Sequence, residues 1–207
     1  MFRNLPNGCS PPAGAKFARQ RTPWFVMVMV VALLFAASSS WGVPAQPLEI
    51  SQFKLTRNDD GLLLDVAVRY ELPYSVADAL HKGVPLYFAM EASLYHDRRY
   101  WRDRLVASAS RTWRLSYLPL TRRYRVSFGG LSQSFDSLYD AVTTVSRIGR
   151  WKLAEPGQIS DSDSESLYVE WRYKLDTGML PRAMQIGIGG QPDWQLLIEK
   201  TQRVSGP

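Results

Sequence analysis

Hydrophobic and polar residues alternate one by one over much of the chain, which is the pattern of β-strands that bury one face. The clearest case is the segment 166–176, in which every second residue is hydrophobic. Similar alternation occurs over residues 62–70, 86–94, 113–117 and 124–128. The chain is therefore predicted to be mainly β.

Turn-forming residues separate the predicted strands and indicate how they pair. The sequence Asn58-Asp59-Asp60-Gly61 lies between strands at 50–57 and 62–71, which predicts a hairpin. The two longest strands, 84–96 and 104–118, are expected to pair with each other around the polar stretch that joins them. Short connections of this kind favour antiparallel sheets.

Two short segments favour α-helix instead of strand. Ser75 and Asp78 have the spacing of a capping box, and Gly83 follows as a stop signal. A second helix is predicted from Ser137 to Gly149, with hydrophobic residues along one face. Strands at hairpin spacing with two short amphipathic helices predict an antiparallel β-sandwich-like domain. A single curved sheet with helices on one face is the alternative.

The first 45 residues have the composition of an export leader. Four basic residues and no acidic residue precede a hydrophobic run at 25–37, and small residues follow up to Ala45. This order is typical of a secretory signal peptide, here with cleavage after Ala45. The run is shorter than the roughly 20 residues of a spanning helix. With its flanking residues it is just long enough, so an uncleaved anchor is the alternative.

The leader divides the chain into a signal peptide or signal anchor at 1–45 and a single β-rich domain at 46–207. In either case a hydrophobic leader helix precedes the domain. The basic residues lie on the N-terminal side of the hydrophobic run, so the domain should cross the inner membrane. We therefore expect the domain in the periplasm, either free or tethered to the inner membrane by residues 24–42.

Charge and cysteine content narrow the classes of function. The net charge of +6 falls to +2 for residues 46–207, because the leader holds four of the 25 basic residues and none of the 19 acidic ones. The high pI is therefore weak support for nucleic-acid binding, and no nucleic-acid partner is expected. The single cysteine, Cys9, lies in the leader, so the domain has no disulfide, thiol nucleophile or cysteine-metal site.

Few residues are candidates for catalysis or metal binding. His96 lies beside Asp97, and such a pair can orient a base. No serine or metal motif accompanies it, so a structural role is expected. The alternating acids from Asp161 to Glu165 lack the glycine and glutamate of a calcium-binding loop, which favours a solvated loop. Gly187–Gly190 is expected to be a turn. We predict no catalytic residue, no metal site and no cofactor.

The most unusual feature of the domain is a concentration of arginine. Residues 98–125 hold nine arginines against one acid, Asp103, with tyrosine and tryptophan residues among them. Guanidinium groups bind phosphates and carboxylates and stack on aromatic rings. By strand parity, Arg114, Arg123 and Arg125 should share one solvent-exposed face. The candidate contact residues are Arg98, Trp101, Arg102, Arg114, Arg123 and Arg125.

Several segments are similar to a known family. They are Trp113–Val126, with the sequence WRLSYLPLTRRYRV, then Ser134–Leu138 and Tyr173–Asp176. In these segments the chain resembles a proteobacterial family of exported proteins, domain of unknown function 4390, over roughly residues 48–198. The resemblance implies export behind an N-terminal signal or anchor, and gene neighbourhoods with a membrane sensor histidine kinase. It supplies no catalytic residues.

These observations predict an exported envelope protein with a non-catalytic binding or accessory domain in the periplasm. The arginine residues would contact another envelope protein or an anionic membrane surface. A solvated sheet face, paired in part with the protein's own acids, is the simpler interpretation of the same residues. Two further alternatives are an accessory subunit of a membrane sensor kinase system and a hydrolase-like enzyme that uses His96 and Asp97.

Overall fold

The computed structural model describes residues 48–159 and 166–204, which belong to one unit that begins at Ala45. The leader predicted at 1–45 and the acids from Asp161 to Glu165 lie outside the described residues. The described residues therefore form the β-rich part of the chain.

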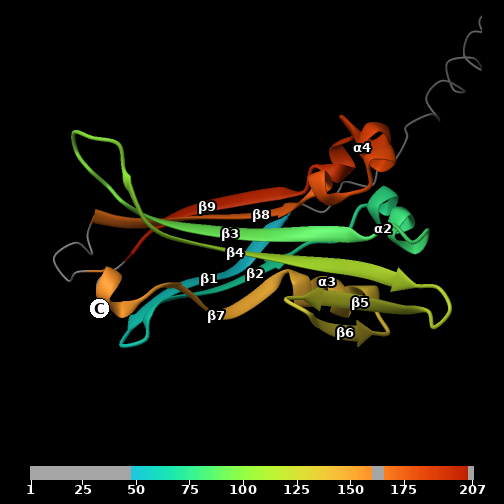
Figure 1. The fold of residues 1–207 in the computed structure, drawn as a ribbon, viewed down its shortest axis with the longest axis horizontal. Helices are drawn as coiled ribbons and strands as arrows, with labels where there is room; N and C mark the ends of the chain where they lie inside the picture. Colours follow the sequence, from blue (N-terminus) through green and yellow to red (C-terminus); the bar gives the residue numbers. More distant parts are fainter. Residues whose placement is uncertain (1–47, 160–165, 205–207) are drawn as a thin grey trace, which may run out of the picture. The chain divides into compact units, whose positions relative to one another are not determined.

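Nine strands form two antiparallel sheets in the described residues (Figure 1). The smaller sheet has the order β1-β2-β7, with β1 at Glu49–Asn58, β2 at Gly61–Arg69 and β7 at Arg147–Ala154. The larger sheet has the order β6-β5-β4-β3-β8-β9, with β6 at Leu131–Phe135, β5 at Arg123–Phe128, β4 at Arg104–Leu118, β3 at Leu86–His96, β8 at Leu167–Leu175 and β9 at Leu197–Arg203. The prediction of a mainly β, antiparallel domain is confirmed.

The hydrophobic faces of the two sheets form the core. Phe53 of β1 contacts Trp171 of β8, with ring centroids 5.9 Å apart. Tyr70, directly after β2, shares a hydrogen bond of 2.8 Å with Tyr173 of β8 through their hydroxyl groups. The hydrophobic members of the alternating pattern in β2, β3 and β8 are buried in this core, so the pattern identified the core-facing residues.

The predicted hairpins form with the predicted partners. Asn58 pairs with Gly61 across a two-residue turn, and β3 pairs with β4 along its length. β5 pairs with β4 only from Arg114 to Leu118. Along the edge of β4 that faces β5, no described strand pairs with the first ten residues of β4.

Three helices occur in the described residues, α2 (Tyr74–His81), α3 (Leu138–Val145) and α4 (Arg182–Ile188). None of these helices is both long and hydrophobic enough to cross a membrane. α2 and α3 are the two helices that the sequence predicts, and α4 is an additional one.

The capping box predicted for the first helix is wrong. The N-cap of α2 is Pro73, without a side-chain cap. The Ser75 hydroxyl donates instead to the Asp193 carboxylate at 2.8 Å. A contact between residues so far apart in the chain has replaced the local cap.

The predicted end of the second helix is also wrong. Ser137 caps α3 as expected, since its hydroxyl accepts from the Tyr139 amide. The helix ends at Val145, because Ile148 already pairs with Val66 of the smaller sheet. Gly149 therefore belongs to β7 and does not terminate the helix. Similarly, the turn predicted at Gly187–Gly190 begins only after Ile188, the last residue of α4.

The larger sheet has one covered and one open face. The smaller sheet, α2 and α3 pack on its inner face (Figure 1). The His81 ring of α2, for example, packs on Tyr117 and Tyr124, with centroids 5.1 and 5.8 Å away. On the outer face alternate residues are exposed, namely Ser108, Ser110, Thr112, Arg114, Arg123, Arg125, Glu170, Arg172, Glu199 and Thr201. No described element covers these residues, so the outer face is available for contact.

Candidate functional site

Three of the predicted contact residues lie together on the outer face. Across the β4–β5 pair, Arg125 faces Ser116, Arg123 faces Leu118, and Arg114 faces Ser127. Cross-strand partners point to the same side of a sheet, so all three guanidinium groups project from one face. We call Arg114, Arg123 and Arg125 the arginine face. Their common orientation is the one that strand parity predicts.

The charges of the arginine face are only partly balanced. Arg123 Nε donates to the Asp136 carboxylate at 2.7 Å. Arg114 and Arg125 form no ion pair with any residue that the structure describes. Tyr87 of β3 is the cross-strand neighbour of Arg114. The arginine face therefore combines two unpaired cations with an aromatic ring, an arrangement suited to a carboxylate or phosphate ligand.

The other three predicted contact residues lie elsewhere. Arg98, Trp101 and Arg102 belong to the turn between β3 and β4, at the opposite end of β4 from its pairing with β5. From the turn to Arg114 the strand extends roughly 35 Å, at about 3.3 Å per residue. The arginine-rich segment thus forms two separate surfaces. We call residues 98–102 the β3–β4 tip.

Arg111, also in this segment, lies on the inner side of the sheet. Its guanidinium group lies 5.2 Å from the Phe128 ring centroid and 5.9 Å from that of Trp151. Arg111 therefore helps to close the core through cation–π contacts and is not part of either surface.

The His96–Asp97 pair does not have the geometry of a catalytic dyad. His96 Nδ1 lies 3.0 Å from the backbone carbonyl oxygen of Asp97. The Asp97 carboxylate accepts a hydrogen bond of 3.1 Å from Arg203 of β9. Neither contact joins the imidazole to the carboxylate, as a general base would require.

A groove of about 380 Å³ on the outer face was not predicted from the sequence. Glu91 of β3, Glu170 and Arg172 of β8 and Glu199 of β9 line it. Arg172 Nε donates to Glu199 at 2.5 Å, while Lys174 Nζ binds Glu91 at 2.9 Å. The sequence shows that these acids occupy the outward-facing polar positions of their strands. It does not show that they lie side by side, because that depends on the order of the strands in the sheet.

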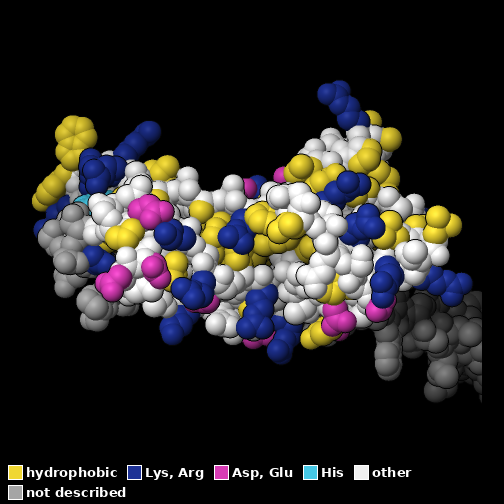
Figure 2. All heavy atoms as spheres, turned by 60° about the horizontal axis from the view of Figure 1, so that its bottom comes forward, with side chains coloured by type: hydrophobic (Ala, Val, Ile, Leu, Met, Phe, Trp, Pro, Cys, Tyr) yellow, Lys and Arg dark blue, Asp and Glu magenta, His cyan; other side chains and the backbone are white. Residues whose placement is uncertain are grey.

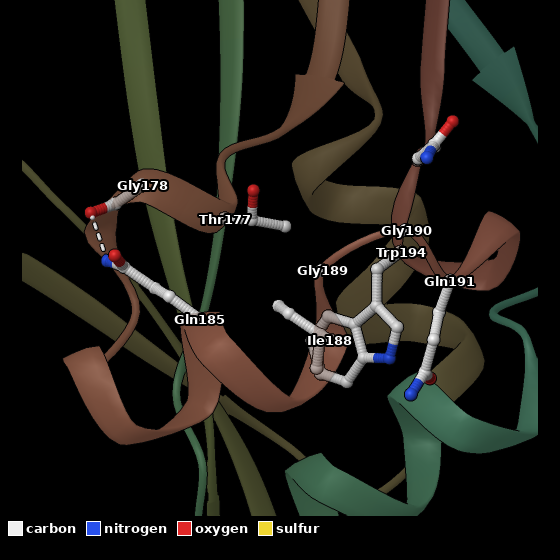
Figure 3. A pocket seen from close by; sticks show the side chains of 9 residues that line it. Thr177, Gly178, Gln185, Ile188, Gly189, Gly190, Gln191 and Trp194 are labelled. Atoms are coloured by element: carbon white, nitrogen blue, oxygen red, sulfur yellow. Dashed lines mark hydrogen bonds between the residues drawn. The ribbon is translucent and has the colours of Figure 1, made fainter.

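A second cavity, of about 240 Å³, lies between the turn after β8, α4 and the turn before β9 (Figure 3). It is lined by Thr177, Gly178, Gln185, Ile188, Gly189, Gly190, Gln191, Trp194 and Gln195. The Gln185 amide donates to the carbonyl oxygens of Gly178 and Leu180, at 2.8 and 2.7 Å. This side chain ties the turn to α4. The cavity wall has no charged side chain.

The described residues contain no cluster of metal-ligating side chains. No group of three or more His, Cys, Asp or Glu side chains gathers there with the geometry to hold a metal ion.

Comparison with known proteins places the chain in a family. It matches the family model described as Domain of unknown function (DUF4390) over residues 45–204. The chain belongs to this family. Membership of this family, which the sequence indicated as a resemblance, is therefore confirmed, and the match spans both sheets and both surfaces. Comparisons with curated proteins and with solved structures find no match. The family's description names no activity.

Proposed function

We propose that the protein is a non-catalytic binding domain of the bacterial envelope, and that the arginine face contacts an acidic segment of another envelope protein. One observation carries the proposal. Arg114 and Arg125 project from an uncovered sheet face without an ion pair to any described residue. Neighbouring cations repel each other, and the carboxylates of a partner would relieve that repulsion through charge-assisted hydrogen bonds.

The surroundings of the two arginines favour such a contact. Ser116 and Ser127, their cross-strand partners, are small and leave the guanidinium groups accessible. The sheet backbone fixes the spacing of the arginines, so binding costs less conformational entropy than it would on a mobile loop. Tyr87 adds a partly exposed ring beside Arg114, which is a residue type enriched in protein interfaces.

The proposed compartment is the periplasm. This part of the proposal rests on the composition of residues 1–45, with basic residues before a hydrophobic run and small residues up to Ala45. In that compartment the domain would meet the periplasmic parts of other envelope proteins.

Crosslinking in intact cells tests the arginine face. With a photoreactive amino acid in place of Ser116, we expect a covalent adduct with a protein that carries an acidic segment. The double charge reversal Arg114→Glu/Arg125→Glu should reduce this adduct about tenfold, which corresponds to a binding loss of about 1.4 kcal/mol. Mass spectrometry of the captured species identifies the partner and measures its yield.

The control is a matched charge reversal on the smaller sheet. Arg69 and Arg147 are also exposed arginines on neighbouring strands, so Arg69→Glu/Arg147→Glu changes the net charge equally and should leave the adduct intact. An adduct that both double variants reduce alike reports net charge only. That result, or an adduct unchanged by the reversal at Arg114 and Arg125, would remove the arginine face as the contact.

A reporter fused after Pro207 tests the compartment. We expect alkaline phosphatase to be active in this position, because its disulfides form outside the cytoplasm, and to lose activity when residues 24–37 are deleted. The intact mass of the exported chain then separates cleavage after Ala45 from an uncleaved anchor. A fusion that is active only with a cytosolic reporter would contradict export, and with it the class of partner.

A further inference from the structure

We infer that the β3–β4 tip is a membrane-contact element that inserts Tyr100 and Trp101 into the headgroup layer of an anionic lipid surface. This inference concerns a different surface from the arginine face and a different partner, so the proposed function does not depend on it.

The tip exposes two large aromatic side chains. Tyr100 is 86% exposed and Trp101 is 81% exposed. Hydrophobic and basic side chains gather at the end of the domain that carries this turn (Figure 2, left; the turn is at the left in Figure 1). Neighbouring aromatic rings that remain in water indicate an interaction site. Tyr and Trp have an apolar body and a polar edge, which suits the boundary between headgroups and acyl chains.

The charges of the tip match an anionic lipid surface. Arg98, Arg99 and Arg102 are exposed and form no ion pair with any described residue. Guanidinium groups bind phosphate oxygens through two parallel hydrogen bonds. Cations near an anionic membrane are attracted over about one Debye length. The aromatic side chains and the unpaired cations thus occupy one short turn.

The acids at the base of the tip are occupied by other contacts. Asp103 accepts a hydrogen bond of 2.6 Å from the Tyr168 hydroxyl and one of 3.2 Å from the Arg98 amide. The Tyr168 hydrogen bond is the main reason that the pKa of the Asp103 carboxyl lies below its usual range, with the Arg98 amide second. Asp97 is bound to Arg203. Asp97 and Asp103 therefore hold the turn, and neither pairs with an arginine side chain of the described tip.

Backbone contacts also fix the turn in advance. The Asp97 amide donates to the Ser166 carbonyl at 2.7 Å, and the Trp101 amide donates to the Arg98 carbonyl at 3.3 Å. The rings of Tyr95 and Tyr168 stack beside the base, with centroids 5.5 Å apart. A turn that is already ordered loses little entropy when it enters an interface.

The size of the tip favours lipid over protein as its partner. A stable protein interface buries about 800 Å² on each side, from about 20 to 30 residues. The tip offers only the side chains of residues 98–102. A few interfacial aromatic and basic residues are sufficient for contact with headgroups, because that contact requires no shape complementarity.

A fluorophore at the tip tests the inference in the full chain. We would place the label NBD on a cysteine at position 100 (Tyr100→Cys, with Cys9→Ser) and reconstitute the chain in phosphatidylglycerol-containing or pure phosphatidylcholine vesicles. We expect a nitroxide carried by the lipid to quench the label strongly in the first vesicles and weakly in the second. The leader is present in every sample and cannot produce the difference.

Two variants and a control site define the outcome. Each arginine near an anionic surface contributes about fivefold to binding, so Arg98→Gln/Arg99→Gln/Arg102→Gln should lower the insertion constant roughly a hundredfold. Trp101→Ala should lower it as well. A label at the exposed Thr143 of α3 should not be quenched in either vesicle.

Three results would overturn the inference. The first is a tip label that stays in water in both vesicles. The second is equal quenching at the tip and at Thr143, which would mean that the whole domain lies on the membrane. The third is quenching that requires added envelope proteins, because a protein would then be the partner of the tip.

Discussion

Replacing Gly61 by alanine is expected to destabilise the protein by about 3 to 5 kcal/mol. Gly61 has a φ of 107°, where side chains other than hydrogen are strained. A Cβ at this position would also overlap the carbonyl oxygen of Ala154. The next residue of β2, Leu62, pairs with Ala154 of β7, so the overlap would force the smaller sheet apart. Urea unfolding followed by far-UV circular dichroism measures the loss.

Gly83 supplies the control for this experiment. It has a φ of 91°, and a Cβ there would meet nothing within 4 Å. Gly83→Ala therefore has the backbone strain without the overlap, and should cost only about 1 to 2 kcal/mol. If the two variants unfold at the same urea concentration, the close approach of Gly61 to β7 does not constrain the fold.

The sequence was most informative where alternation is unbroken. β4 and β5 begin and end at the predicted residues, 104–118 and 123–128, and alternate side chains are buried or partly buried against one core from Ala107 to Tyr117 and at Tyr124 and Val126. The short turn between them also fixes the register that places Arg114 and Arg125 on one face. Local pattern and tertiary packing agree here, so the bounds and the pairing of these two strands could be predicted from the sequence.

β7 was missed because its buried positions do not alternate regularly. Ile148 and Trp151 are buried, with Gly149 and Arg150 between them. Arg150 has a φ of 50°, and the β2–β7 register shifts at this point. In the sequence, Ile148 comes three residues after Val145, a spacing that also fits one face of a helix. The pairing with β2, a long-range contact, decides between helix and strand.

β9 was missed for a different reason. Lys200 occupies a position on the inner side of this edge strand, and its ammonium group lies 4.8 Å from the Phe53 ring centroid. A cation–π contact thus replaces the hydrophobic residue that would have completed the alternation. Without the contact to Phe53, the polar run 199–203 gives no sign that this segment is a strand.

The candidate surfaces were only half predictable. Strand parity groups Arg114, Arg123 and Arg125 correctly, but the distance between this group and the β3–β4 tip depends on which part of β4 pairs with β5. The contacts of Asp103 and Asp97 with Tyr168 and Arg203 join strands that are distant in the sequence. Only the folded sheet shows that these acids are occupied and that the arginines of the tip have no ion pair with another described residue.

Above pH 10 the protein should lose stability steeply, and the buried pair Tyr70 and Tyr173 should account for much of the loss. Burial is the main cause that raises the pKa of both hydroxyls above 10, although the hydrogen bond to Tyr173 partly offsets it for Tyr70. In the unfolded chain both hydroxyls lose their protons near pH 10, while the folded protein keeps them. The free energy of unfolding therefore falls as the pH rises, by about 1.4 kcal/mol per pH unit for each tyrosine.

Phenylalanine variants isolate this pair. In Tyr70→Phe/Tyr173→Phe neither hydroxyl remains to titrate, so urea unfolding measured from pH 9 to pH 12 should show a shallower decline above about pH 10, by roughly 2.7 kcal/mol per pH unit. Tyr168 and Tyr124, whose pKa values are also raised, account for part of the remaining decline. Tyr74 is 86% exposed, and Tyr74→Phe should leave the decline unchanged. If the double variant and Tyr74→Phe lose stability equally fast, the buried pair does not control the alkaline transition.

At neutral pH either single variant, Tyr70→Phe or Tyr173→Phe, leaves one buried hydroxyl without its partner and should lower the free energy of unfolding by about 1 to 3 kcal/mol. The double variant should lower it by less than the sum of the two.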